Sequence, residues 1–325
     1  MILNIISTVN GIENEGMRNI ASHIQRELEE SCDVRHSSLG DPIRCIKNSV
    51  GADAVRIFAR ASAKVAYLAK ILRIFCSRVY FILVQRPESG FIRSMVKNIR
   101  KYSYFSILEN DGEELTSLGG QVRALSVGIN SEKFRPVSGR DELISLRKKY
   151  GLSVDLPLVL HVGHLSSGRG LEAFLSLPKE RFERLIVASG MFNSDEIEEK
   201  LRSDGVHIIK EYLPDVSEVY RMADVYLFTT RSSEFVISIP LSVTEALSCG
   251  TPVVAFSGVD GINNISATYS ESLVCISDES ELVRAVETAA ATFFDNRQTL
   301  LSGMCSWKDA AARLLEDIKG DIVPQ

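Results

Sequence analysis

Two successive series of short apolar runs, each run followed by apolar residues at helical spacing, constrain the fold of this chain most. The first series opens with ILNIIST and MRNIASHIQRELEE, and the second opens with LPLVLHVG at residue 156 and reaches PVVAF at 252–256. Strands that alternate with helices predict parallel sheets with right-handed crossovers. The chain is therefore expected to be an α/β protein with two doubly wound parallel-sheet domains.

The length of 325 residues exceeds the size at which a single core usually keeps growing. A polar, proline-containing stretch, FRPVSGRDELISLRKKYGLSVDLP, separates the two series. We therefore expect one domain at 1–137, a second at 138–304, and a C-terminal helix at 305–325 that crosses back to the first domain. Ligands of such sheets bind at the carboxyl ends of the strands, so the expected site is a cleft between two facing domains.

The net charge of −5 conceals a strongly basic segment. Between residues 44 and 101 there are thirteen Lys and Arg residues but two Asp and Glu residues. Within it, 54–77 is expected to form one helix, with an apolar side and a basic side. The apolar side would carry Phe58, Val65, Leu68, Leu72 and Phe75, and the basic side Arg56, Arg60 and Lys64.

Two interpretations of this basic side stay open. It is either the solvated side of a helix that packs on the sheet, or a surface for anionic lipid or for a lipid-diphosphate acceptor. Nucleic acid is disfavoured, because no aromatic residues are interleaved with the basic ones as a stacking platform.

The compartment is indicated by what the sequence lacks. The N-terminal MILNIISTVNG has no basic segment followed by a long apolar one, and the six cysteines show no C-x-x-C spacing. The most apolar window, 65–84, contains Lys70, Arg73 and Arg78, which disfavours a membrane span. We expect a cytoplasmic protein, with peripheral contact at the inner membrane face through 44–101 as one alternative.

The stretch SSEFVISIPLSVTEALSCGTPVVAF at 232–256 contains one acidic residue in an otherwise apolar helix. Residues 243–249 are expected to form this helix, with Glu245 in its first turn and Gly250, Thr251 and Pro252 ending it. A carboxylate in a first turn is stabilised by unpaired N–H groups, so Glu245 could serve the helix alone. The alternative is that it binds a ligand.

LSVTEALSCGTPVVAF resembles the donor-site signature of the retaining family-four glycosyltransferases, written G-x-P-L-x-x-x-E-A-x-A-C-G-x-P-V-V-A. Four more stretches are similar to that family in the same order, and the N-terminal NGIENEGMRNIASHI is similar more weakly. They are LSVGINSEKFRPV, HVGHLSSGRGLEAFLSL, DVSEVYRMADVYLFTT and CSWKDAAARLLEDI. The resemblance implies the GT-B fold, two Rossmann-like domains that face a cleft, and a nucleotide-sugar donor bound by the second domain.

The resemblance also implies roles for particular residues. Glu245 matches the acid that binds the ribose hydroxyls, and a carboxylate accepts two hydrogen bonds from a vicinal diol well. His164 and Arg169 match the cationic residues that neutralise the diphosphate, Arg169 at any pH and His164 when protonated. The remaining donor-site positions are Gly11, Gly16, Gly163, Ser238, Pro240 and Leu241.

The sequence departs from the family at one catalytic position. The family has a second Glu eight residues before the first, and position 237 here is Ile, which cannot accept a hydrogen bond from a sugar hydroxyl. Glu234 is expected to replace it if its loop folds inward. The alternatives are a donor sugar deoxygenated at that position, or a chain without transferase activity.

The glycine-rich loop GHLSSGRG at 163–170 also imitates a P-loop. It lacks the Lys and the following Ser or Thr that would hold phosphate and Mg²⁺, so we do not expect an NTPase. No Asp-x-Asp pair stands at an expected strand end, and we expect no metal and no cofactor.

The resemblance thus predicts a retaining glycosyltransferase that moves a sugar from a UDP- or GDP-sugar to a glycan or lipid-linked acceptor in cell-surface polysaccharide or glycoconjugate synthesis. A catalytically silent nucleotide-sugar-binding subunit of a partner transferase is the alternative, and a nucleotide-sugar epimerase fits the second half less well.

Overall fold

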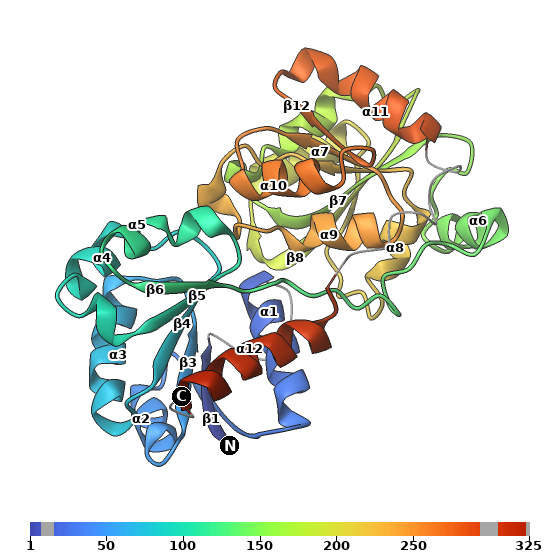
Figure 1. Ribbon diagram of the computed structural model, residues 1–325. Helices are drawn as coiled ribbons and strands as arrows, with labels where there is room; N and C mark the ends of the chain where they lie inside the picture. Colours follow the sequence, from blue (N-terminus) through green and yellow to red (C-terminus); the bar gives the residue numbers. More distant parts are fainter. Residues whose placement is uncertain (8–15, 293–304, 323–325) are drawn as a thin grey trace. The chain divides into compact units, whose positions relative to one another are not determined.

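The computed structural model describes residues 1–7, 16–292 and 305–322, which form two compact units (Figure 1). Unit 1 comprises Met1–Gly128, Ile237–Ile239 and Cys305–Gln325, and unit 2 comprises Ile129–Val236 and Pro240–Met304. Each unit is built on one six-stranded sheet, and all strand pairs are parallel. The prediction of two Rossmann-like α/β halves is therefore confirmed.

Within the described ranges, no helix combines the length and the apolar character that crossing a bilayer requires.

The sheet of unit 1 has the order β2-β1-β3-β4-β5-β6. Its strands are β1 (Ile2–Ser7), β2 (Asp33–Ser38), β3 (Ala54–Phe58), β4 (Val79–Leu83), β5 (Ser103–Ser106) and β6 (Gln121–Ala124). One face is covered by α2 (Pro42–Ser49), α3 (Ala63–Phe75) and α4 (Ser89–Met95), and α5 (Glu113–Ser117) follows them in the chain. The other carries α1 (Gly16–Glu29) and α12 (Trp307–Ile322), which pack on each other (Figure 1). The C-terminal helix thus belongs to the same unit as the N-terminal strand.

Ion pairs and ring contacts attach α12 to this unit. The guanidinium of Arg123 on β6 donates to both carboxylate oxygens of Asp321, at 2.9 and 2.6 Å, and the Tyr80 hydroxyl donates to the same carboxylate at 3.0 Å. At the other end of α12 the Trp307 ring stacks on His23 of α1, with 4.7 Å between ring centroids. Both ends of the last helix are therefore held by the first 128 residues.

The prediction of a single helix over 54–77 is wrong. Residues 54–58 form β3, in the middle of the sheet, and the helix α3 begins at Ala63. A five-residue run that is buried on both faces of a parallel sheet has no periodicity that distinguishes strand from helix. Arg56 consequently does not lie on a solvated basic side. It is fully buried, and none of its three guanidinium nitrogens has a hydrogen-bond partner in the described part of the chain.

Replacement of Arg56 by Met is expected to stabilise the protein. Burial lowers the pKa of Arg56 to about 10, so at neutral pH the fold holds a charged guanidinium that has no counter-ion among the residues described. Removing such a charge is expected to raise the free energy of unfolding by about 1–4 kcal/mol. Urea unfolding of Arg56→Met and of wild type at pH 6 and pH 8 measures this, with the same gain expected at both. A loss of stability would mean that the guanidinium makes a favourable contact.

The sheet of unit 2 has the order β12-β11-β10-β7-β8-β9. Its strands are β7 (Leu158–Leu165), β8 (Glu183–Asn193), β9 (His207–Ile209), β10 (Val225–Phe228), β11 (Val253–Phe256) and β12 (Leu273–Ile276). The first strand, β7, lies between β8 and β10, so the winding direction reverses between β7 and β10. Ligands of doubly wound sheets bind at the carboxyl ends of the strands at such a reversal.

Helices cover both faces of the second sheet. The turns of η4 (Leu171–Ser176) and the helices α7 (Asp195–Ser203) and α11 (Leu282–Thr292) share a core with one face. The remaining helices of the unit are α6 (Arg140–Lys149), α8 (Ser217–Met222), α9 (Leu241–Ser248) and α10 (Asp260–Thr268).

The boundary between the units lies after Gly128, whereas the sequence suggested 137. Residues 129–137 belong to unit 2 because Phe134 is buried against it. The Phe134 carbonyl accepts a hydrogen bond from the Ser248 hydroxyl at 2.6 Å, and its ring meets the Tyr220 ring edge-on at 5.9 Å. The segment after β6 is thus packed on unit 2 rather than acting as an extended linker.

Candidate functional site

Arg169 lies directly after β7, at the point where the winding of the unit 2 sheet reverses. It ends a single turn, η3 (Ser167–Arg169), and its carbonyl accepts a hydrogen bond from the hydroxyl of Thr229, which follows β10, at 2.6 Å. Gly170 then takes a φ of +64°, and a Cβ at this position would be 2.8 Å from the Thr229 carbonyl oxygen. The backbone of Arg169 is therefore held against the end of the neighbouring strand, and glycine is required after it.

The Arg169 side chain is half-buried and makes no hydrogen bond or ion pair with another of the described residues. Burial lowers the pKa of Arg169, and a nearby Tyr226 raises it in part. An arginine nevertheless stays protonated at neutral pH. The loop thus presents a partly desolvated cation that has no counter-ion in the described part of the chain, which is what an anionic ligand requires.

His164 does not provide a second cation near neutral pH. Burial, and then the charge of Arg169, lower the pKa of His164 to about 4. Its Nδ1 lies 2.5 Å from the Ser189 hydroxyl on the adjacent strand β8. The residue is therefore neutral at pH 7 and can only exchange hydrogen bonds with a ligand, which removes the protonated role that the sequence left open.

His161, two residues earlier on β7, was not singled out from the sequence. Its Nδ1 lies 3.0 Å from the Leu227 carbonyl, so the proton is on Nδ1, and the buried Nε2 has no hydrogen-bond partner among the residues the structure describes. A Cβ at position 163 would lie 2.9 Å from this Nε2, which explains why Gly163 follows. Gly163 is thus needed for packing inside the unit.

Glu245 is not in the first turn of its helix, and this prediction is wrong. The helix α9 begins at Leu241, with Pro240 as its N-cap, so Glu245 lies in the second turn. Burial raises the pKa of Glu245 to about 7, against the opposing effects of the Tyr220 hydroxyl and of Lys133. Helix N–H groups would lower the pKa instead. Glu245 therefore does not serve to stabilise α9, and a carboxylate with a raised pKa is typical of a functional position.

Tyr220 fixes the orientation of this carboxylate. The Tyr220 hydroxyl donates to Glu245 Oε2 at 2.8 Å, and the Thr251 hydroxyl after α9 donates to the Tyr220 carbonyl at 2.7 Å. Gly250, with a φ of +71°, provides the turn that brings Thr251 back, as the sequence predicted. The carboxylate thus keeps one oxygen on Tyr220 and has the other for a ligand.

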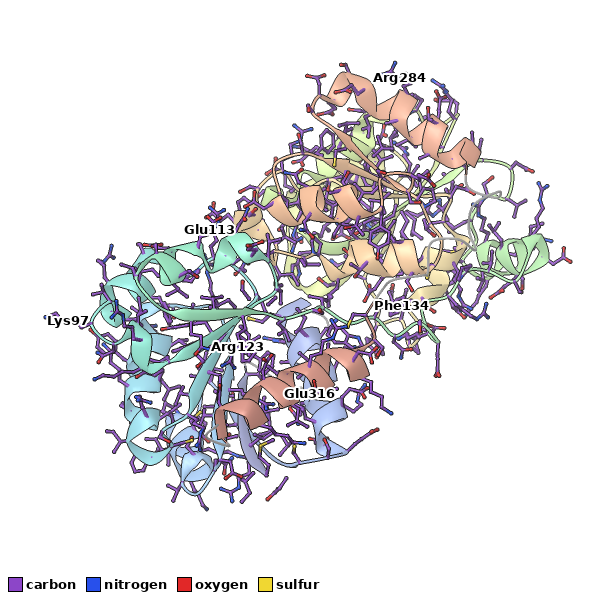
Figure 2. The ribbon with its side chains drawn as sticks, in the orientation of Figure 1. Lys97, Glu113, Arg123, Phe134, Arg284 and Glu316 are labelled. Atoms are coloured by element: carbon purple, nitrogen blue, oxygen red, sulfur yellow. The ribbon has the colours of Figure 1, made fainter. Side chains whose placement is uncertain are left out.

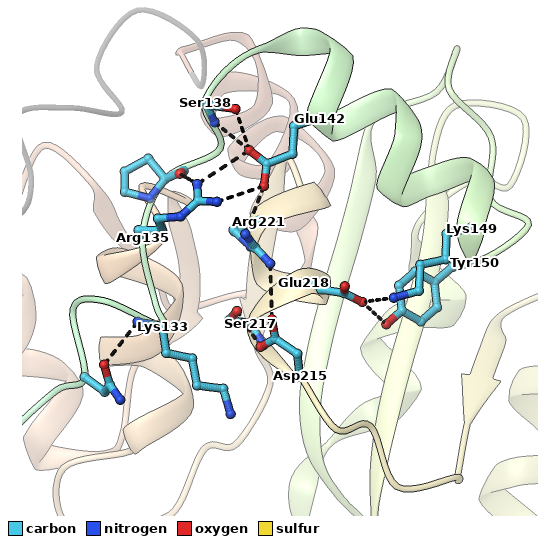
Figure 3. Close-up of polar contacts among 12 residues, drawn as sticks. Lys133, Arg135, Ser138, Glu142, Lys149, Tyr150, Asp215, Ser217, Glu218 and Arg221 are labelled. Atoms are coloured by element: carbon cyan, nitrogen blue, oxygen red, sulfur yellow. Dashed lines mark hydrogen bonds and ion pairs between the residues drawn. The ribbon is translucent and has the colours of Figure 1, made fainter.

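A polar network holds α8, the helix that carries Tyr220 (Figure 3). Arg221 donates to Glu142 of α6 at 2.9 Å and to Asp215 at 3.3 Å. Glu218 accepts from Lys149 at 2.6 Å and from the Tyr150 hydroxyl at 2.7 Å. Two residues of α8, Glu218 and Arg221, are thus bonded to Lys149 and Glu142 of α6, which reduces the freedom of Tyr220.

Tyr226 on β10 connects the two charged residues. Its hydroxyl donates to the Val162 carbonyl at 3.2 Å, and its ring packs on Tyr220 at 5.7 Å between centroids. The charge of Glu245 raises the pKa of this phenol and the charge of Arg169 lowers it, after the larger effect of burial. The charges of Glu245 and Arg169 thus both act on this phenol, and the two residues do not form an ion pair with each other.

The other residues predicted for the site do not all lie beside Glu245 and Arg169. Pro240 and Leu241 are buried at the start of α9, but Ser238 groups with unit 1, where its N–H donates to the Val84 carbonyl at 2.9 Å. Glu234 lies on the turn η5 (Ser233–Phe235) with an exposed side chain, rather than folded inward.

The two N-terminal glycines give little information on a ligand. Gly16 is the first residue of α1, and Gly11 lies outside the described residues. Across the described ranges, no group of three or more His, Cys, Asp or Glu residues is arranged to hold a metal ion. The expected absence of a metal stays a prediction.

Sequence reasoning missed the two tyrosines of the site. Both stand in DVSEVYRMADVYLFTT, a stretch whose resemblance was recognised, but nothing in the spacing of Tyr220 and Glu245 along the chain predicts their hydrogen bond. A polar aromatic residue in an apolar strand was the available signal, because a buried tyrosine hydroxyl needs a partner.

Comparisons with known proteins agree with this architecture. The family model for glycosyl transferases group 1 matches residues 157–292. The D-inositol 3-phosphate glycosyltransferase of Xylanimonas cellulosilytica is 28% identical over 232 residues, which is 63% of this chain and 54% of that protein. The alpha-galactosylglucosyldiacylglycerol synthase of Streptococcus pneumoniae is 23% identical over 141 residues, 39% of this chain and 35% of that protein. The chain thus spans about half the length or less of these relatives.

The crystal structure of Anabaena Alr3699/HepE in complex with UDP-glucose superimposes with a TM-score of 0.78 at 13% identity, over 98% of this chain and 100% of that one. This likeness shows the fold, and two parallel-sheet units of this order define a GT-B protein. Together with the family-model match to residues 157–292, it supports the predicted resemblance to the group 1 glycosyltransferases.

Proposed function

We propose that the chain transfers a sugar from a nucleotide-sugar donor to an acceptor hydroxyl, with retention at the anomeric carbon and without a metal ion. The observation that carries this proposal is the arrangement around Tyr226. Glu245 accepts a hydrogen bond from Tyr220, whose ring packs on Tyr226, and the backbone of Arg169 is bonded to Thr229 just after the strand of Tyr226, at the reversal point of the sheet. These groups suit the two ends of a nucleoside diphosphate.

In the proposed complex, the free oxygen of Glu245 and the oxygen on Tyr220 accept hydrogen bonds from the ribose hydroxyls. The guanidinium of Arg169 pairs with the diphosphate. As the bond between the anomeric carbon and the phosphate oxygen breaks, the acceptor oxygen bonds to the same face of that carbon, and its proton passes to the departing phosphate oxygen. Negative charge develops on the phosphate oxygen as the bond breaks and before the proton reaches it, and Arg169 stabilises this charge.

The donor is proposed to be a UDP- or GDP-sugar, and Anabaena HepE, which was solved with UDP-glucose, supports UDP. The acceptor is proposed to be a glycan or a lipid-linked glycan of a cell-surface polysaccharide or glycoconjugate. The Streptococcus relative, named as a glycolipid synthase, and the basic segment 44–101 support an acceptor at an anionic membrane surface. We accordingly propose peripheral association at the cytoplasmic face of the inner membrane.

A thermal-shift panel of UDP, GDP, ADP and UDP-glucose tests the donor site. A ligand present at 100 times its Kd is expected to add about 2.7 kcal/mol of stability. For units of this size that corresponds to a shift in Tm of roughly 5–10 °C. One nucleotide is expected to give this shift in wild type and to lose it in Glu245→Ala. No shift with any nucleotide would contradict the proposal, and the anomeric configuration of the product would test retention.

A second candidate function is a silent donor-binding subunit of a partner transferase. The specific observation in its favour is that position 237 is Ile and that Glu234, the proposed replacement for the family's carboxylate, is exposed on η5. Slow donor hydrolysis by wild type would support the enzyme. Tight binding without release of free nucleotide would support the subunit.

A further inference from the structure

Three adjacent helices of unit 1, α2, α3 and α4, form a surface that we call the α2–α4 face. They pack on one another and cover the same face of the sheet (Figure 1). No residue within these three helices is Asp or Glu. Their basic residues are Arg44, Lys47, Lys64, Lys70, Arg73 and Arg93, and Lys97 follows α4. The outside of this layer is therefore positively charged.

The same surface exposes large apolar side chains. Along the outward stripe of α3, Tyr67 is 61% exposed, Ile71 44% and Ile74 78%, while the Lys70 ammonium lies over the Tyr67 ring at 4.8 Å. Ile43 on α2 and Val96 after α4 are exposed as well. A helix that only packs on a sheet has polar residues on its outer side. An apolar stripe on the outer side indicates a surface that is covered by a partner.

The helices on the opposite face of the unit 1 sheet differ from the α2–α4 face in their charge and in their exposed apolar residues. The helices α1 and α12 contain acidic as well as basic residues, and none of the exposed large apolar side chains is on either of them. Figure 2 shows Lys97 extending outward on the α4 side of unit 1, whereas Glu316 lies on α12. The combination of exposed apolar and basic side chains is thus confined to one face of the unit.

We propose that the α2–α4 face docks on an anionic lipid bilayer, with the apolar stripe of α3 entering the interfacial region and the basic residues contacting lipid phosphates. This deepens the membrane association proposed above, on which it rests, by naming the surface and its lipid class. Two basic residues of the segment 44–101, which suggested the membrane association, are not part of this surface. Arg56 is buried in β3, and Arg60 pairs with Glu88 at 3.0 Å.

The charge of the face favours a bilayer over other partners. A second copy of the chain would present the same positive charge and be repelled. A nucleic acid would need aromatic side chains for stacking, and the stripe is mainly aliphatic. An anionic bilayer offers negative headgroups above an apolar layer, which matches basic residues placed around exposed isoleucines.

Cosedimentation with vesicles tests this proposal and needs neither donor nor turnover, so its outcome is independent of the catalytic proposal. The full chain is mixed with vesicles of phosphatidylglycerol and phosphatidylcholine at 1:1, and with vesicles of phosphatidylcholine alone. The apolar variants are Ile74→Ser and Ile71→Ser/Ile74→Ser. The charge variant is Lys64→Gln/Lys97→Gln, and its matched control is Lys308→Gln/Lys319→Gln, which removes two exposed lysines from α12.

Wild type is expected to bind the anionic vesicles, to bind the phosphatidylcholine vesicles at least tenfold more weakly, and to dissociate as salt is raised. Each lysine removed from the α2–α4 face is expected to weaken binding about fivefold, whereas the α12 control binds like wild type. The isoleucine variants are expected to lose binding while keeping the Tm of wild type, because Ile74 is exposed. The proposal is overturned if wild type does not bind anionic vesicles, if both lysine pairs have equal effects, or if the isoleucine variants bind fully. Self-association that Ile74→Ser abolishes would assign the face to a second copy instead.

Discussion

Arg169→Ala is expected to lower the rate of donor turnover, measured as release of free nucleotide, by roughly 10²–10³-fold, which is the usual effect of removing one group that stabilises transition-state charge. Arg169 is the cation that the loop after β7 holds without an ion-pair partner among the described residues, and the Thr229 hydroxyl fixes its backbone at 2.6 Å. The stability of the fold is expected to be unchanged or increased, because burial already disfavours the charged guanidinium. Arg169→Lys is expected to restore part of the rate.

Arg231→Ala is the matched control for this experiment. Arg231 follows the neighbouring strand β10, but its exposed guanidinium is paired with Glu279 at 3.0 Å. Its removal is expected to leave the turnover rate within about twofold, since exposed ion pairs contribute little. An equal loss of rate in both variants would show that the rate depends on the net charge of unit 2 and not on Arg169 in particular. Full activity of Arg169→Ala would remove this residue from the mechanism.

The sequence predicted the two sheets because their central strands are apolar runs, and it failed where that signal is weak. The edge strand β2, DVRHSS, has mostly half-buried and polar residues, and neither it nor α2 was predicted. The edge strand β12 of the second sheet has two exposed residues of four, and the region between β11 and residue 305 was left without predicted elements. An edge strand is covered on fewer sides, so its sequence needs no apolar run.

The error over 54–77 has a different origin, since β3 is central. A fully buried arginine violates the expectation that charged residues lie outside, and Arg56 matched the spacing of Arg60 and Lys64 on a helix. The correct strand could be inferred only by accepting an unfavourable residue in the core.

The sequence predicted the charged residues of the candidate site but not the residues that surround them. The motifs identified Glu245 and Arg169, but the residues that determine their behaviour come from other elements. The Tyr220 contact spans 25 positions of the chain. The neutrality of His164 depends on burial, which the sequence of the loop does not show. Motifs therefore predict which residues act, whereas their protonation states require the packed structure.

Glu245→Gln is expected to stabilise the protein at pH 8 and to leave its stability unchanged at pH 4. The folded-state pKa of Glu245, about 7, lies above the ordinary value of 4.5. Below pH 4.5 the carboxyl is protonated in both states. Between pH 4.5 and 7 the unfolded chain ionises first, so wild type loses stability, and above pH 7 the full cost remains.

A glutamine stays neutral and keeps an acceptor for the Tyr220 hydroxyl. Its gain at pH 8 is expected to be on the order of 2 kcal/mol, a value reduced from the full shift because Glu245 is half-buried. Glu234→Gln, which changes an exposed carboxylate of the same unit, is expected to unfold like wild type at both pH values. Urea unfolding at pH 4, 6 and 8 distinguishes these variants.

The same substitution is expected to weaken binding of the nucleotide at pH 8, because an amide oxygen accepts hydrogen bonds from a ribose diol less strongly than a carboxylate does. Wild-type affinity is expected to rise by up to about tenfold per pH unit between pH 5 and 7, as the bound diol favours the ionised carboxyl, and to level off above pH 7. Nucleotide phosphates also titrate in this range, but they do so equally with both proteins. The ratio of the two Kd values, measured by calorimetry at each pH, therefore isolates Glu245. If the ratio of the Kd values does not change with pH, Glu245 does not contact the donor. If Glu245→Gln raises stability but lowers nucleotide affinity in a pH-dependent way, the protein keeps an acid that destabilises the fold because that acid binds the donor.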